Sequence, residues 1–156
     1  MKKLIMVLAA LMLTVCSNAQ TLKDYTIGET LYGESQIMTT VAGIPGVLVA
    51  YTLDNNTIYA IAFIPSSDGV GIDRVYLTDL NRLVEGIEKN YNIDLVASYN
   101  QWDELETYYN NSVEFLIMVD YNKYMSPPYE ISLFITDNEL NKIKTLEEQN
   151  EADSDF

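Results

Sequence analysis

The feature that most constrains the fold is a pair of β-forming segments joined by a short turn. Residues 47–53 and 57–64 are rich in the aliphatic and aromatic side chains that favour strands. Asp54, Asn55 and Asn56 lie between them, and Asn and Asp tolerate the positive φ angles of tight turns. The pattern predicts a β-hairpin. Its second strand is apolar on both faces, which is typical of a central strand covered on each side.

One segment shows a clear helical period. Apolar residues recur at three- and four-residue spacing from about Asp73 or Thr78 to Asn90, and polar residues fill the other face. Gly86 lies inside this segment, where glycine costs about 1 kcal/mol relative to alanine. We expect close packing on the sheet there, against the small Ala60 and Ala62 of the hairpin. The pattern therefore predicts one long amphipathic helix.

Further strands are expected before and after this helix. The segment 36–42 has strand composition and is a candidate exposed edge. After the helix, apolar and polar residues alternate most clearly in 113–121 and 129–136, which favours antiparallel pairing with one face inward. The segment 94–99 also resembles a strand. The segment 102–109 fits a short helix and a strand equally well.

The end of the sequence predicts a short helix and a tail. Thr136 and Glu139 have the spacing of a capping box, so a helix is expected to start near Asp137. Together these patterns predict an α+β fold: an antiparallel sheet of about five strands, one long amphipathic helix on a face and a short C-terminal helix. We expect one domain over residues 20–148 and an acidic flexible tail over 149–156.

The first nineteen residues have the layout of a bacterial signal peptide. Lys2 and Lys3 precede an apolar stretch over 4–15, and small residues at 17 and 19 fit a cleavage site after Ala19. The stretch is shorter than the roughly 20 residues that span a bilayer. We expect export to the periplasm or the exterior. The alternative is a membrane-anchored lipoprotein, because residues 13–16 resemble a lipobox ending at Cys16.

The composition excludes several kinds of chemistry. The chain has no histidine, and Cys16 is its single cysteine. Residues 20–156 therefore lack the groups for thiol catalysis, Ser-His-Asp triads and the usual zinc sites. The 23 acidic residues against nine basic ones give a net charge of −14. Such a charge disfavours nucleic-acid binding, which requires a basic surface.

Carboxylates leave two chemical alternatives. Asp103, Glu104 and Glu106 lie beside Trp102 and are candidates for the acid pair of a small hydrolase. With 23 acidic residues, such a group is expected by chance. The segment 68–73 has carboxylates at both ends but lacks the ligand spacing of a calcium loop. We therefore predict no catalytic residue, metal or cofactor, and interpret Asp73 as an acidic cap of the long helix.

The twelve tyrosines are the most distinctive part of the composition. Tyrosine offers a wide, rigid contact area with a polar tip, and it is favoured at binding surfaces. We predict a non-catalytic binding or inhibitory module of the bacterial cell envelope that binds a protein, peptide or glycan through an acidic, tyrosine-rich surface. The alternative is a small carboxylate-based hydrolase. The candidate binding residues are Tyr99, Trp102, Tyr108, Tyr109, Tyr121, Tyr124 and Tyr129.

Overall fold

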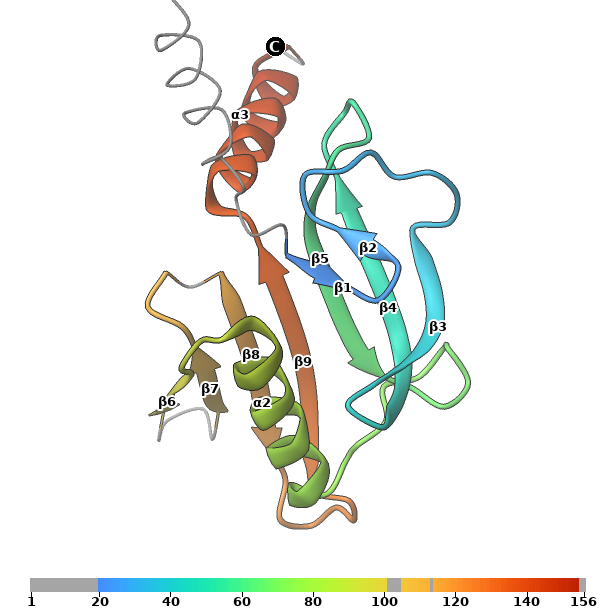
Figure 1. The fold of residues 1–156 in the computed structure, drawn as a ribbon, viewed down its shortest axis with the longest axis vertical. Helices are drawn as coiled ribbons and strands as arrows, with labels where there is room; N and C mark the ends of the chain where they lie inside the picture. Colours follow the sequence, from blue (N-terminus) through green and yellow to red (C-terminus); the bar gives the residue numbers. More distant parts are fainter. Residues whose placement is uncertain (1–19, 101–104, 113, 155–156) are drawn as a thin grey trace, which may run out of the picture.

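The computed structural model describes residues 20–100, 105–112 and 114–154. Its main element is a seven-stranded antiparallel sheet with the strand order β3-β4-β5-β9-β8-β7-β6 (Figure 1). A separate pair, β1 and β2, forms a small second sheet. The elements are β1 (Thr21–Leu22), β2 (Tyr25–Thr26), β3 (Gln36–Val41), β4 (Ile44–Thr52), β5 (Ile58–Pro65), α2 (Leu77–Tyr91), β6 (Val96–Asn100), β7 (Leu105–Tyr109), β8 (Phe115–Tyr121), β9 (Tyr129–Thr136) and α3 (Asn138–Ser154).

The predicted fold class is wrong. The described chain is mostly sheet, with seven strands in the main sheet in place of about five, and two helices. The C-terminal helix was expected to be short, yet α3 has 17 residues and α2 has 15. The extra strands come from the ambiguous segment before Tyr109 and from residues 20–35. Their strand conformation depends on pairing with neighbouring strands, β7 with β6 and β8 and β1 with β2, and the periodicity of a short segment does not reveal such pairing.

The hairpin of β4 and β5 forms where the sequence predicts it. Asn56 adopts a positive φ of 64°, and the Asn55 side chain accepts a hydrogen bond from the Thr57 amide at 3.0 Å. The register of the two strands shifts between Tyr51 and Thr52, so the hairpin contains a β-bulge near its turn. The strands otherwise pair continuously from this bulge to Pro65.

The centre of the sheet joins two segments that are far apart in the sequence. β5 pairs with β9, so that Ile61 lies opposite Ile135 and Phe63 opposite Leu133. All four side chains are fully buried. The three-stranded meander β3-β4-β5 and the four-stranded meander β6-β7-β8-β9 therefore share one core through their last strands.

One face of the sheet is covered by α2 and by the β1–β2 hairpin. In Figure 1, α2 lies in front of β8 and β9, and the hairpin lies in front of β4 and β5. Leu80, Leu83 and Ile87 of α2 are buried against the sheet, and Tyr25 of β2 is 4% exposed. The expected contact of Gly86 with the alanines of β5 is not formed. A Cβ at Gly86 would meet Ala42 at 3.7 Å, an ordinary contact distance.

The caps of both helices differ from the predicted ones. Tyr76 precedes α2, and its amide donates to the Asp79 carboxylate at 3.3 Å; Asp73 lies outside this cap. At α3, the cap is Asp137, whose carboxylate accepts from the amides of Glu139 and Leu140 at 2.9 Å each. Asp137 therefore takes the role that the sequence pattern assigned to Thr136.

The helix α3 projects from the end of β9 and packs only lightly. Leu140 is half-buried, but Ile143 and Leu146 of the predicted apolar stripe are 45% and 58% exposed. The helix extends through Ser154, into the segment predicted to be a flexible tail, and the domain division stays a prediction. No helix among the described residues has the length and apolar character needed to cross a membrane.

Candidate functional site

Several predicted binding residues share the face of the sheet that α2 covers. Tyr108 of β7 lies opposite Ile117 of β8, which is fully buried in the core. Two positions away on the same strand, Glu106 lies opposite Tyr99 of β6. Side chains alternate along a strand, and directly paired residues lie on the same face. Tyr99, Glu106 and Tyr108 therefore lie together on the covered face, beyond the strands that α2 overlies in Figure 1.

The end of the β8–β9 pair adds two more tyrosines to this face. Tyr121 lies opposite Tyr129, and their ring centroids are 5.2 Å apart with an interplanar angle of 43°. The main chain of Val75 fixes the position of Tyr129 through two hydrogen bonds of 2.7 and 3.2 Å. We use the term tyrosine surface for Tyr99, Tyr108, Tyr121 and Tyr129.

The tyrosine surface has an acidic neighbour. Burial raises the pKa of Tyr108, and the charge of Glu106 and its hydrogen bond to Tyr108 raise it further. The phenol therefore stays protonated at neutral pH and acts as a donor. Tyr99 is 65% exposed and Tyr121 42% exposed, so both rings can contact a partner. The surface presents rigid aromatic rings and a carboxylate.

The remaining candidate residues do not join this group. Tyr109 lies opposite Leu116 and Val96, on the other face of the sheet. Tyr124 is 85% exposed in the β8–β9 loop, where Lys123 Nζ lies 5.0 Å from its ring centroid. Trp102 lies outside the described residues. Strand alternation separates Tyr108 from Tyr109, so the sequence carried a signal for this division.

An arginine that the sequence reasoning missed holds the end of β8 and β9 in place. Arg74 contacts the carboxylates of Asp120 at 3.0 Å and Glu130 at 3.2 Å. It also donates to the carbonyl oxygen of Pro128 at 2.8 Å. These partners lie far from Arg74 in the sequence, so no local motif could have indicated the cluster.

The candidate calcium loop has a simpler explanation. Asp68 Oδ1 accepts hydrogen bonds from the amides of Val70 at 2.9 Å and Gly71 at 3.0 Å. The Ser66 hydroxyl also lies 3.2 Å from it. The two amide hydrogen bonds lower the pKa of Asp68. The Asp68 carboxylate thus accepts hydrogen bonds from the backbone amides of its own loop. Asp73 lies among the residues that lead into α2.

The described residues bring no cluster of candidate metal ligands together: no three side chains of His, Cys, Asp or Glu are grouped so that they could hold an ion. Their buried polar side chains are Ser66 and Asn110, neither of which is ionisable. Of the three candidate acids near residue 102, Glu106 lies on the tyrosine surface. Asp103 and Glu104 lie outside the described residues.

Comparisons with known proteins do not assign this chain to a group. No family model, no curated protein and no solved structure matches it. Its function has to be inferred from its own contacts, exposure and charge.

Proposed function

We propose that this chain is an exported, non-catalytic binding or inhibitory module of the bacterial cell envelope. Its export is inferred from the signal-peptide pattern of residues 1–19, which lie outside the described residues. Lipidation at Cys16 remains the alternative that would tether it to a membrane. The ligand is a protein, peptide or glycan bound at the tyrosine surface.

The observation that carries this proposal is the gathering of four tyrosines on one face of the β6–β9 half. Rings held by strand pairing contact a partner with little loss of conformational freedom. Tyr121 and Tyr129 support each other at 5.2 Å, and Tyr108 is anchored by Glu106. This arrangement supports binding through aromatic contact and hydrogen bonding.

The edge of the sheet favours an extended protein segment over a glycan. β6 is the outermost strand on this side, and its described side chains Val96 to Tyr99 are all exposed. A partner strand that pairs with β6 would place alternate side chains beside Tyr99 on the tyrosine surface. The backbone of β6 would then provide affinity, and the tyrosines would provide specificity. No observation favours the alternative of a carboxylate-based hydrolase.

The test is a thermal-shift screen with four probes: a basic decapeptide, an acidic decapeptide, a muramyl dipeptide and chitohexaose. A compound that binds only the native state raises the melting temperature with concentration. Each probe is tested on the protein and on the variants Tyr99→Ser, Tyr121→Ser and Tyr32→Ser. Tyr32 is the matched control, because it is 90% exposed and lies in the segment before β3.

We expect the basic decapeptide to raise the melting temperature of the protein and of Tyr32→Ser. The shift should be lost in Tyr99→Ser and Tyr121→Ser. A ligand whose shift survives in both of these variants binds elsewhere and contradicts the proposed site. The absence of a shift with all four probes contradicts a peptide or glycan ligand at this surface.

A further inference from the structure

The other face of the sheet carries an apolar row across six strands. Val49 lies opposite Ala62, Ala62 opposite Phe134, and Phe134 opposite Leu116. The row continues from Leu116 to Tyr109 and Val96 at the edge. Gln36 of β3 lies opposite Val49 and continues the row, and Met38 is two positions after Gln36, so it lies on the same face. Met118 of β8 is two positions after Leu116 and lies on this face too. We use the term open face for Val49, Phe134, Leu116, Tyr109, Met38 and Met118.

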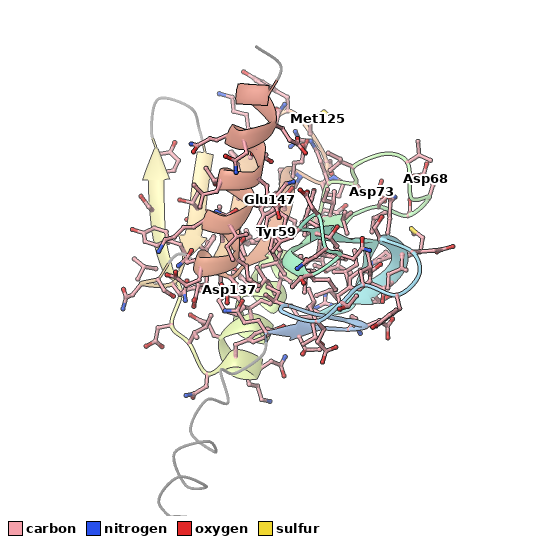
Figure 2. All side chains as sticks on the ribbon, turned by 90° about the horizontal axis from the view of Figure 1, so that it is seen from above. Tyr59, Asp68, Asp73, Met125, Asp137 and Glu147 are labelled. Carbon is pink, nitrogen blue, oxygen red and sulfur yellow. The ribbon has the colours of Figure 1, made fainter. Side chains whose placement is uncertain are left out.

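The open face is only partly covered by the described chain. Met38, Met118 and Val96 are 52%, 38% and 48% exposed, and the ring of Tyr51 at the bulge is 40% exposed. The loop after β5 approaches Met38 closely, because a Cβ at Gly69 would lie 3.0 Å from the methionine sulfur. At the other end, α3 approaches β5 around Tyr59 (Figure 2). Between these ends Ala62 is fully buried, and Val49, Phe134, Leu116 and Tyr109 are half-buried.

Methionines are concentrated where the surface is exposed. Residues 20–156 contain three methionines, Met38, Met118 and Met125, and all three are exposed. Met125 is 51% exposed in the β8–β9 loop, and Figure 2 places it on the side of the molecule away from α2. Flexible, polarisable methionines adapt to irregular apolar partners and are common at docking surfaces. Two of the three, Met38 and Met118, lie on the open face.

The charges around the open face are acidic. Arg74 pairs with two carboxylates, Asp120 and Glu130, so this cluster of three groups carries one net negative charge, and Lys123 of the neighbouring loop lies over the Tyr124 ring. On α3, Lys144 lies 3.5 Å from both Asp54 and Glu147, so its charge is likewise compensated. The sequence of the helix contains four more acidic residues, Glu139, Glu148, Glu151 and Asp153, of which Glu139 pairs with Lys142. A partner with positive charges beside its apolar contact area is complementary to this surface.

We propose that the open face is a docking surface for a basic amphipathic helix of another protein, a site separate from the tyrosine surface. The row from Val49 to Val96 crosses five strand spacings, about 24 Å. An amphipathic helix of about 16 residues has that length. Its apolar stripe covers the row, and basic residues on its flanks meet Asp120, Glu130 and the acidic side of α3.

A second copy of this chain is the less suitable occupant. Residues 20–156 carry seven basic and 23 acidic residues, because Lys2 and Lys3 precede them, and the resulting charge is −16. Two such copies that meet at the open face would bring like charges together around an apolar contact. Charge repulsion therefore disfavours the homodimer and favours a basic partner.

The probe is a fluorescein-labelled 18-residue peptide of leucine and lysine with helical periodicity. Two control peptides are used: one with the same composition but strict alternation, and one with glutamate in place of lysine. Fluorescence anisotropy gives the dissociation constant for the protein and for Met118→Lys and Met38→Lys. Leu77→Lys is the matched control, since Leu77 is 48% exposed on α2 at the other face and gains the same charge.

We expect the helical leucine–lysine peptide to bind at least about tenfold more tightly than either control peptide, a difference of about 1.4 kcal/mol. Met118→Lys and Met38→Lys should each weaken binding about tenfold, and Leu77→Lys much less. Circular dichroism and urea unfolding show whether each variant folds, and either methionine variant suffices for the test. The proposal is contradicted if the alternating peptide binds as tightly as the helical one, or if Leu77→Lys weakens binding as much as the methionine variants do. It is also contradicted if the helical peptide does not bind the protein.

Two further measurements distinguish other occupants. Light scattering gives the mass of the protein in solution, and a dimer that Met118→Lys dissociates would assign the open face to a second copy. Sedimentation with phosphatidylglycerol vesicles tests a membrane, and binding that Met118→Lys abolishes would assign the face to lipid. We expect a monomer and no vesicle binding.

Discussion

Each helix follows a meander of the sheet, but the two helices meet very different surroundings. α2 comes after β3-β4-β5 and buries Leu80, Leu83 and Ile87. α3 comes after β7-β8-β9, is two residues longer, and leaves Ile143 and Leu146 exposed. The two meanders share one sheet, so each helix could in principle lie across the strands of the other half. Only α2 does so (Figure 1).

The two helices also meet different parts of the sheet. The face of β4 and β5 next to α2 is occupied by the β1–β2 hairpin, which buries Leu22, Tyr25 and Ile27. α3 instead approaches β5 around Tyr59, where Lys144 lies 3.5 Å from Asp54, and most of its apolar stripe stays exposed. This comparison shows that the position of a helix depends on the apolar surface left to it, and that length and periodicity do not suffice to predict it.

The largest expected effect comes from shortening one buried side chain of α2. Leu83 is 1% exposed, so Leu83→Ala leaves a cavity and should lower the free energy of unfolding by about 2–5 kcal/mol. The matched change in α3, Ile143→Ala, removes a side chain that is 45% exposed and should cost less than about 1 kcal/mol. Urea unfolding of both variants gives the two values. Equal losses would mean that α3 is docked as firmly as α2.

The second prediction concerns high pH and the C-terminal end of α2. Tyr91 packs its ring 4.7 Å from that of Phe115 and donates to the carbonyl oxygen of Thr21 at 2.5 Å. Burial raises the pKa of Tyr91 from 10.0 to about 12. Its phenol therefore ionises first in the unfolded chain. The stability that this group contributes is complete below pH 10 and is lost as the pH rises from 10 to 12.

Urea unfolding between pH 9 and 12 tests this expectation with two variants. Tyr91→Phe should make the loss of stability less steep between pH 10 and 12, and Tyr124→Phe, at an 85% exposed site, should keep the slope of the unchanged protein. Burial also raises the pKa of Tyr25, Tyr59 and Tyr108, so part of the slope remains in every variant. An unchanged slope in Tyr91→Phe would show that α2 and the hairpin separate before this phenol ionises.

The sequence was sufficient to predict the features that depend on neighbouring residues. The β4–β5 hairpin forms because Asn55 and Asn56 fit its turn, and α2 forms because its apolar residues repeat at helical spacing. Whether a short segment such as β7 forms a strand depends on the strands that pair with it. The same limit applies to α3, whose stripe is evident in the sequence although Ile143 and Leu146 stay exposed in the structure.

A smaller effect is expected from the cap of α3. The Asp137 carboxylate accepts from the amides of Glu139 and Leu140, so Asp137→Ala should cost about 1 kcal/mol. Because α3 packs lightly, we expect the loss mainly as reduced amide-exchange protection within α3. The equivalent change at α2, Asp79→Ala, should instead lower global stability, because α2 cannot fray without exposing the core. Similar exchange profiles in the two variants would contradict this distinction.

The smallest expected effect is at the polar contact of α3 with the sheet. Lys144→Met removes contacts of 3.5 Å to Asp54 and Glu147, both of which are long for ion pairs. We expect the urea midpoint to stay unchanged and the protection of α3 to fall slightly at low salt. Measurements at 0.5 M NaCl should then show no difference between the variant and the unchanged protein. A clear drop in the midpoint would mean that this contact anchors the helix.

The candidate binding residues could be named from the sequence but not assigned to faces without the strand boundaries. Tyr108 and Tyr109 are neighbours in the chain and lie on opposite sides of the sheet. The open face could not be predicted for the same reason. Leu116 and Met118 alternate with the core residues of β8, so they can be assigned to the opposite face only when the strand boundaries are known. Once the strands are placed, period-two alternation assigns all of these residues.

The pairing of β5 with β9 has a consequence for the order in which the chain folds. Phe63 and its partner Leu133 are about 70 residues apart in the sequence. At typical rates of synthesis the ribosome takes roughly 4–14 s to add the residues between them. During that time the inner edge of β5 is unpaired and apolar, although the β4–β5 hairpin can already close. Contacts this distant are slow to form. The inner edge of β5 therefore lacks its hydrogen-bonding partner until β9 has been made, and an unpaired strand edge can pair with another chain.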